Sequence, residues 1–182
     1  MIWRAARMLL CAAIGALSAC GQNLGTYSLA GLSKTDDLPE AFKRSSGYDG
    51  HYGQFLRVEL ESSANINEFD TGSGLYADAG DCPIQKHGSV VAFGPFDLSG
   101  EEVGAGHSPS QLKPTDDGFF HYLVYLVTAV SAQTGPNGFT PYDLSRERKD
   151  MCLRLYSPGY HITPSRSHTV RIPAAEIARA LR

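Results

Sequence analysis

FFHYLVYLVTAVSA, residues 119–132, is the stretch of the sequence that decides the fold. Apolar residues occupy both its odd and its even positions, and aromatic and β-branched side chains are frequent. Such a stretch is typical of a central strand that is covered on both faces. A buried helix is the alternative, but turn-forming residues lie on either side, at 116–118 (DDG) and 133–138 (QTGPNG). The flanks and the β-branching therefore favour a strand.

A second strand is predicted at residues 54–61 (QFLRVELE). Leu56, Val58 and Leu60 alternate with charged residues, and this period of two is typical of a half-buried strand in an antiparallel sheet. Further strands are predicted at residues 89–93, 150–157 and 167–172. The segment 158–166 contains Pro and Gly and suits a hairpin between the last two.

The chain ends in PAAEIARALR, residues 173–182, which predict a short helix. Pro173 suits the first helical position, and Glu176 and Arg179 suit the charges of the helix dipole. The narrow apolar stripe of this helix is expected to pack on the sheet. One or two more strands are expected within the turn-rich stretches 70–88, 94–118 and 133–149. We therefore predict a mainly β domain, an antiparallel β-sandwich or jelly-roll-like fold with a short C-terminal helix.

The first twenty residues have the layout of a secretory signal. Arg4 and Arg7 precede an apolar run at residues 8–17, and small residues follow. Ten residues rise only about 15 Å as a helix, whereas the hydrocarbon core of a membrane is about 30 Å thick. The segment therefore predicts export rather than a transmembrane anchor.

Leu17-Ser18-Ala19-Cys20 closes this signal and resembles the lipobox of bacterial lipoproteins. In that family the cysteine thiol is acylated and signal peptidase II cleaves just before it. The resemblance covers residues 1–20 and implies that Cys20 is the lipidated N-terminus, carrying acyl chains such as palmitate. Gly21, where an Asp would resemble inner-membrane retention, implies an outer-membrane lipoprotein facing the periplasm. The alternative is an ordinary signal cut after Ala19, which leaves Cys20 as a free thiol.

These features divide the chain into a signal peptide at 1–19, a lipidated N-terminus and flexible tether at 20–52, and a β-sandwich domain at 53–182. The tether is predicted because this segment is rich in Gly, Ser, Lys and Asp and has no sustained apolar period, apart from a short piece near 38–42. Loss of two arginines with the signal leaves 14 basic residues against 19 acidic ones, a formal charge of −5. This acidity argues against binding to nucleic acid.

The two remaining cysteines, Cys82 and Cys152, are expected to form one disulfide, because disulfides persist outside the cytoplasm. A metal-binding pair and two free thiols are the alternatives. Neither cysteine belongs to a C-x-x-C motif, so zinc binding and thioredoxin-like chemistry are weakly supported.

The common catalytic motifs are absent from the sequence, so no catalytic residue, metal or cofactor is predicted. The six histidines are scattered, without the spacing of a local metal site. Asp70, Asp78 and Asp81 lie on a Gly-rich stretch but lack the spacing of an EF-hand calcium loop. Candidate ligand-binding residues, of a type that contacts sugars, are Asp49, His51, Tyr160 and His161. Against sugar binding, the mature chain contains no tryptophan.

The sequence thus favours a lipid-anchored cell-envelope lipoprotein with a non-enzymatic, protein-binding role in assembly, in a secretion system, or as an inhibitor or immunity protein. Its expected partners are the membrane, through the acyl chains, and another envelope protein. The alternative is a periplasmic domain that binds a sugar or metal, or that hydrolyses a substrate, through the loop His, Asp and Tyr residues.

Overall fold

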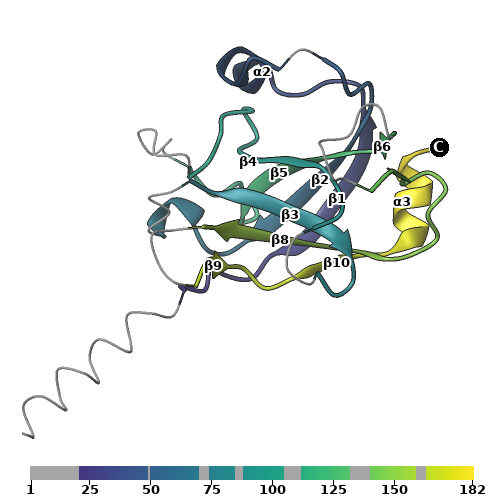
Figure 1. Cartoon of the computed structure of the whole chain (residues 1–182). Coiled ribbons are helices and arrows are strands. Elements are labelled where there is room, and N and C mark those ends of the chain that lie inside the picture. The colour runs from purple at the N-terminus through teal and green to yellow at the C-terminus, as the bar shows by residue number, and fades with distance from the viewer. Residues whose placement is uncertain are drawn as a thin grey trace, which may run out of the picture.

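The structure is a computed structural model that describes residues 21–48, 50–69, 74–84, 88–104, 112–131, 140–158 and 163–182. Two antiparallel sheets pack face to face (Figure 1). The first sheet has the order β1 (Ser28–Thr35), β2 (Phe55–Ser62), β5 (Phe120–Val127) and β4 (Ala92–Phe96). The second has the order β10 (Val170–Ile172), β8 (Met151–Ser157) and β3 (Tyr76–Asp81), and β9 (Ser165–Arg166) pairs with β8. The predicted mainly β sandwich is confirmed.

The predicted central strand is β5, which lies between β2 and β4. Side chains at its even positions, such as Tyr122 and Val124, face the core between the sheets. Those at odd positions, such as Leu123 and Tyr125, face a second cluster on the outer side of the first sheet. The strand ends at Val127, earlier than predicted, and the chain continues as β6 (Ala129–Val130), which pairs with β7 (Tyr142–Asp143).

The main core includes a buried tyrosine that closes one end of the sandwich. The hydroxyl of Tyr122 accepts the N–H of Ile66 at 2.9 Å, and it donates to the carbonyl of Ala64 at 3.1 Å. Ile66 begins the 3₁₀ helix η1 (Ile66–Glu68) and is itself fully buried. Burial raises the pKa of Tyr122 to about 12, so this hydroxyl stays neutral and keeps donating.

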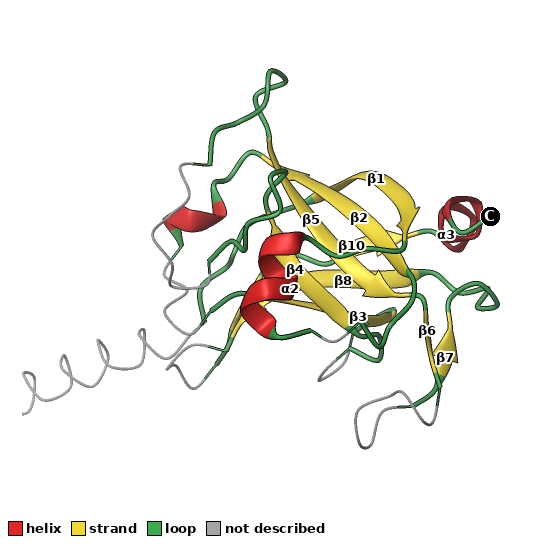
Figure 2. Cartoon of the chain, turned by 90° about the horizontal axis from the view of Figure 1, so that it is seen from above, coloured by secondary structure: helices red, strands yellow, loops and turns green. Residues whose placement is uncertain are grey.

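The second cluster lies beneath helix α2 (Glu40–Ser46), which covers the outer side of the first sheet near β4 (Figure 2). This helix has no fully buried residue and is attached mainly through Phe42. The Phe42 ring lies 5.4 Å from the rings of both Phe93 and Phe96. The short helix α2 thus covers this face of the first sheet, and the two together enclose a small hydrophobic core.

The predicted tether at 20–52 is wrong over most of its length, and the domain begins near Gln22 rather than at residue 53. The N–H of Gln22 donates to Ser165 Oγ at 2.9 Å, and Leu24 is fully buried. Strand β1 then pairs with β2 along its length. Strand β1 was not predicted because its sequence, SLAGLSKT, has no β-branched apolar residue. Main-chain hydrogen bonds to β2 hold it in the sheet.

One strand differs from its predicted position, and another lies in a stretch where one or two further strands were expected without bounds. The strand expected at 89–93 is β4, three residues further on, and Val90 forms only an isolated bridge with Ala79. Strand β3 lies within a stretch that was expected to be rich in turns. Its sequence, YADAGD, has a low β propensity, and tertiary contacts with β8 determine its conformation.

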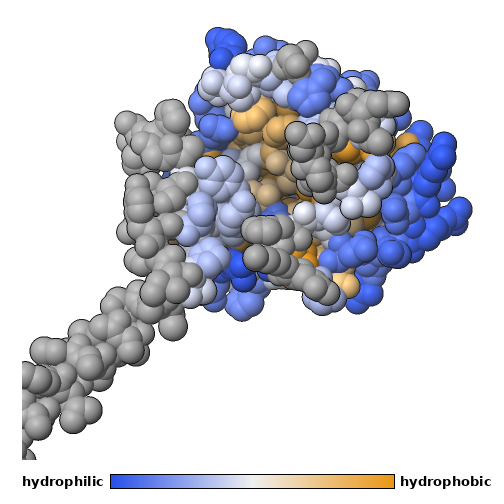
Figure 3. All heavy atoms as spheres, in the orientation of Figure 1, coloured by the Kyte–Doolittle hydropathy of each residue, from blue (hydrophilic) through white to orange (hydrophobic). Residues whose placement is uncertain are grey.

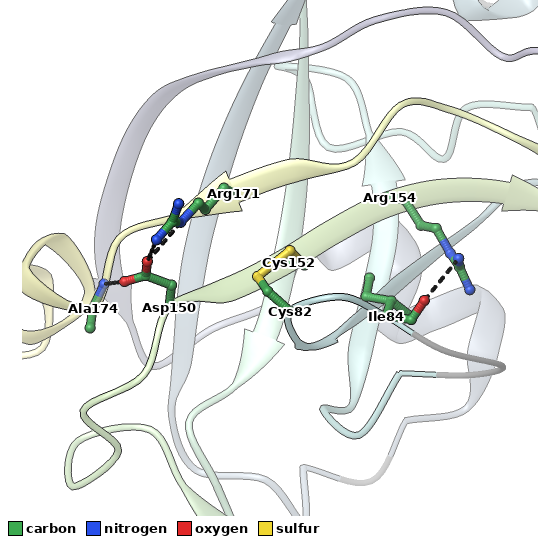
Figure 4. Close-up of a disulfide and its surroundings, with 7 residues drawn as sticks. All are labelled: Cys82, Ile84, Asp150, Cys152, Arg154, Arg171 and Ala174. Atoms are coloured by element: carbon green, nitrogen blue, oxygen red, sulfur yellow. Dashed lines mark hydrogen bonds and ion pairs between the residues drawn. A yellow bond between two sulfur atoms is a disulfide. The ribbon is translucent and has the colours of Figure 1, made fainter.

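The predicted C-terminal helix is α3 (Ala174–Ala180), which begins directly after Pro173 and buries Ile177. No side chain of the helix caps its first turn. Instead, Asp150 accepts the N–H of Ala174 at 2.9 Å and binds Arg171 Nε at 2.7 Å (Figure 4). This acidic group at the helix start joins α3 to β8 and β10.

The predicted disulfide between Cys82 and Cys152 is confirmed, with a Cα–Cα distance of 5.1 Å (Figure 4). It joins the end of β3 to β8. Separately, within the described parts of the chain, no helix combines the length and the apolar character needed to cross a membrane.

We expect replacement of both Cys82 and Cys152 by Ser to lower the free energy of unfolding by about 4 kcal/mol. The crosslink closes a loop of 70 residues, which removes conformational freedom from the unfolded chain. Urea denaturation of the variant and of the reduced wild-type protein should give similar losses. Two alkylatable thiols in the unreduced wild-type protein would contradict the expectation.

Candidate functional site

The structure describes one of the four predicted ligand-binding residues. Asp49, Tyr160 and His161 lie outside the described residues, as does the lipidation residue Cys20. His51 is exposed and lies against two tyrosines, with ring centroids 4.0 Å from Tyr52 and 5.2 Å from Tyr48. The hydroxyl of Tyr48 in turn accepts the N–H of Tyr52 at 2.8 Å. The alternative of a ligand site joining these loops therefore stays a prediction.

Two of the aspartates considered for calcium have basic partners instead. Asp78 is nearly buried and binds Arg154, with Arg154 Nη2 at 2.7 Å and Nε at 3.0 Å from Asp78 Oδ2. Asp81 faces Lys149, with 3.5 Å between Oδ2 and Nζ. Across the described ranges, no group of three or more His, Cys, Asp or Glu side chains is placed to hold a metal ion. Asp70 lies outside these ranges.

A cleft of about 400 Å³ opens where the edges of the two sheets meet. Strand β3 is one edge of the second sheet and β4 is one edge of the first. Figure 3 shows an apolar surface in this region, between α2 and β3. We call this feature the edge cleft; its lining residues are Phe42, Gly74, Leu75, Tyr76, Ala77, Ala92, Phe93, Gly94, Pro95, Glu102, Val103 and Tyr156.

Aromatic rings form two sides of the edge cleft. Tyr76 on β3 and Tyr156 on β8 are neighbours across the ladder, with ring centroids 5.7 Å apart. Tyr76 is 47% exposed, which is unusual for a large apolar side chain in this protein. On the opposite side, Phe42 of α2 packs against Phe93 of β4. The cleft therefore offers flat, partly exposed rings from three strands and one helix.

Beside the cleft, the buried ion pair fixes the position of β3. The second carboxylate oxygen of Asp78 accepts a hydrogen bond from the N–H of Gly88. Arg154 Nη1 donates to the carbonyl of Ile84 at 3.5 Å (Figure 4). Pairing and hydrogen bonding together compensate for the loss of hydration of the two charges. The edge strand is thus attached to β8 by its side chains as well as by its ladder.

Glu102 is the only charged residue that lines the described cleft. It is partly exposed and lies beside β4, where it forms an isolated bridge with Phe96. Within the described ranges, no Lys, Arg or His side chain pairs with its carboxylate. The site therefore combines an apolar surface with one negative charge.

Sequence reasoning missed this cleft. Its walls are mostly apolar side chains and main chain, which no catalytic or ligand motif describes. It also depends on β3, which the sequence presents as a turn-rich stretch. The available signal was the aromatic character of Tyr156 and Tyr76, whose neighbourhood only the β3–β8 register reveals.

A separate polar cluster surrounds His121 on the outer side of the first sheet. Its Nδ1 lies 3.0 Å from Glu59 Oε1, and its Nε2 lies 3.1 Å from Asp117 Oδ2. Desolvation lowers the pKa of His121, but the hydrogen bonds and charges of the two carboxylates outweigh it and raise the pKa above its ordinary value. Hydrogen bonds from Thr115 and from the N–H of Phe119 lower the pKa of Asp117 to about 2.

We expect His121→Gln to destabilise the protein more at about pH 5 than at about pH 8.5. The pKa of this histidine is raised by folding, so its stabilising contribution is complete below the unfolded pKa and is lost as the pH rises through the folded pKa. Urea denaturation at both pH values measures the difference. His168→Gln is the matched control, because His168 is exposed and its imidazole hydrogen-bonds, within the described structure, to the Thr26 hydroxyl and to no carboxylate. An equal loss at both pH values would contradict the expectation.

Comparison with protein-family models, with curated proteins and with solved structures gave no match for this chain.

Proposed function

We propose that this chain is an exported lipoprotein of the bacterial cell envelope, anchored through Cys20 and binding another envelope protein without catalysing a reaction. The observation that carries the proposal is the acylation motif at residues 17–20, directly before a folded domain with an open apolar cleft. The proposed location is the outer membrane, facing the periplasm. The disulfide supports export, because such bonds persist outside the cytoplasm.

The start of the domain bears on how such an anchor would work. Arg166 N–H donates to the carbonyl of Gln22 at 3.1 Å, and Leu24 N–H donates to the carbonyl of Arg166 at 3.0 Å. The first residue held by the fold therefore follows Cys20 by only two positions. Two residues span at most about 7 Å, so an acylated Cys20 would hold the domain against the headgroups.

The edge cleft supports a binding role. An open cleft with exposed aromatic rings and a single charge matches the composition of protein-binding surfaces, in which Tyr and Phe are enriched and charges are few. Assembly, secretion and inhibition all remain within this proposal, since each requires recognition of another protein.

Replacement of Cys20 by Ala is expected to release most of the protein into the soluble periplasmic fraction. The reason is that the acyl chains are the proposed attachment, and Cys20 is their only site. Fractionation with detection by immunoblot measures the effect. Cys11→Ala, which changes another cysteine of the leader, is the control and should leave the protein in the membrane. Unchanged membrane association of Cys20→Ala would refute the anchor.

A photo-crosslinking residue in place of Tyr76, at the edge cleft, is expected to capture a specific protein in native envelopes. The same residue in place of Arg179, on the exposed side of α3, is the control and should not capture that protein. Mass spectrometry of the crosslinked bands identifies the partner. Equal capture from both positions, or no captured protein together with a co-purifying small molecule, would count against the proposed function.

A further inference from the structure

The direction of the main-chain groups on β3 follows from the hydrogen bonds of its neighbour. Leu155 of β8 donates its N–H to Ser167 Oγ at 2.9 Å, and its carbonyl accepts the N–H of Ser167 at 2.9 Å. Both main-chain groups of Leu155 therefore point away from β3. Ala77 lies directly opposite Leu155 in the ladder. In an antiparallel pair, the N–H and carbonyl groups of two opposed residues either both point toward the partner strand or both point away from it. The N–H and carbonyl of Ala77 consequently point away from β8, toward the open edge.

On β4, the direction of the main-chain groups follows from the pairing with β5. The carbonyl of Val91 accepts a hydrogen bond from the N–H of Val127 at 2.9 Å, so this main-chain carbonyl points toward β5. Ala92 is the next residue and is opposite Leu126 in the register. Since alternate residues of a strand point to opposite sides, the N–H and carbonyl of Ala92 point away from β5. They face the same open side of the sandwich as those of Ala77.

The two edge strands meet at one point and then separate. Val90 N–H donates to the carbonyl of Ala79 at 2.9 Å, which forms a single antiparallel bridge. The next pair in that direction would be Ala77 and Ala92, and both line the edge cleft. In the structure as described, no hydrogen bond engages the outward main-chain groups of this pair. The cleft therefore contains donors and acceptors at strand spacing, within apolar walls.

Unpaired edges of this kind are templates for another strand. We infer that the edge cleft binds an extended polypeptide segment of a partner protein, which adds as a β-strand to the main chain of Ala77 and Ala92. This inference rests on the proposed function, because it supplies the mode by which the domain would bind a protein.

The lining specifies the side chains of that segment. The rings of Phe42, Phe93 and Tyr76 favour an apolar or aromatic side chain on the face that enters the cleft. The Glu102 carboxylate favours a Lys or Arg near that end, and the acidic mature chain would attract a basic segment at longer range. The expected ligand is a basic, alternating apolar strand. An acyl chain or a sugar could fill the same volume, but neither would pair in register with the amides of both strands.

The test uses the exported, purified protein and a display library of random twelve-residue peptides. Selected peptides should alternate apolar residues and contain Lys or Arg. On binding, the amide of Ala77 or Ala92, or both, should become protected from hydrogen exchange, as measured by NMR. N-methylation of a peptide amide that pairs with Ala77 or Ala92 should weaken binding about ten-fold, whereas N-methylation of peptide amides beyond the cleft should leave binding unchanged.

Two variants of Ala77 separate main-chain pairing from the shape of the cleft. Ala77→Pro removes the outward N–H but no hydrogen bond to β8, and edge strands tolerate proline at such positions. It should weaken peptide binding about ten-fold, whereas Ala77→Ser, which keeps the N–H, should bind like the wild type. Glu102→Gln should remove the preference for Lys and Arg. Thermal melting and disulfide mapping confirm that each variant is folded, and the N-methyl series needs no variant at all.

Three results would overturn the inference. The first is a set of selected peptides that protects neither amide. The second is equal binding of all N-methylated peptides. The third is occupation of the cleft by decanoate or by an N-acetylglucosamine dimer, with neither amide protected. Photo-crosslinking distinguishes this failure from that of the proposed function. If the Ala77→Pro variant still captures a specific partner, the domain binds a protein but not by strand addition. If peptides bind the cleft but no envelope partner is captured, strand addition stands and the proposed function fails.

Discussion

The buried ion pair between Asp78 and Arg154 is the interaction on which the cleft side of the molecule depends. Both residues are more than 90% buried, and a charge left there without its partner would cost about 3–5 kcal/mol. The pair therefore holds β3 against β8 although the sequence of β3 favours a turn. The N–H of Gly88 also donates to the Asp78 carboxylate, and a Cβ at that position would clash with the carbonyl oxygen of Ala79. A glycine is needed for the chain to pass so close to β3.

The disulfide also attaches β3 to β8, at the C-terminal end of β3. Because Cys152 and Arg154 lie on one face of β8, the covalent bond and the ion pair are consecutive attachments of β3 to the outer side of the second sheet. Tyr76 and Tyr156 follow on that face, at the edge cleft. Among the described residues, the main-chain bridge between the two edges is the one from Ala79 to Val90, just before β4, so β3 is fixed to its own sheet and separates from the other. The open edge is thus a consequence of where the attachments are.

The periodicity of apolar residues predicted those elements that bury a regular pattern of their own side chains. The central strand β5, the half-buried β2 and the helix α3 all carry an apolar pattern of the correct period, and the structure confirms them. Strands β1 and β3 carry no such pattern, because partners elsewhere in the chain supply their stabilisation. Leu24 and Tyr27 make the same point: they are buried in a segment rich in Gly and Ser, where isolated apolar residues have no local period to reveal them.

The site was less predictable than the fold for a related physical reason. Sequence reasoning searches for titratable side chains: it selected His51, and it considered the Asp-rich stretch for calcium and set it aside. Asp78 of that stretch is an internal counter-ion of Arg154. The edge cleft is instead built from main-chain groups whose orientation depends on register. The disulfide was predictable because it requires only two cysteines in an oxidising compartment.

The corrected start of the domain changes what an anchor at Cys20 would imply. A tether of some thirty residues would let the domain sample about 30 Å above the membrane. With Gln22 already bonded to Ser165, the anchor would instead fix the β9 end of the sandwich at the headgroups (Figure 1). In Figure 1 β9 lies at the lower left of the domain and α2 at its top. The edge cleft is lined by Phe42 of α2 and by Tyr76 and Ala77 of β3. A strand-forming segment of a partner would then have to approach along the membrane surface or from above α2. Restricted orientation of this kind reduces the entropy lost on binding, so a short basic segment could be held by a cleft with few contacts.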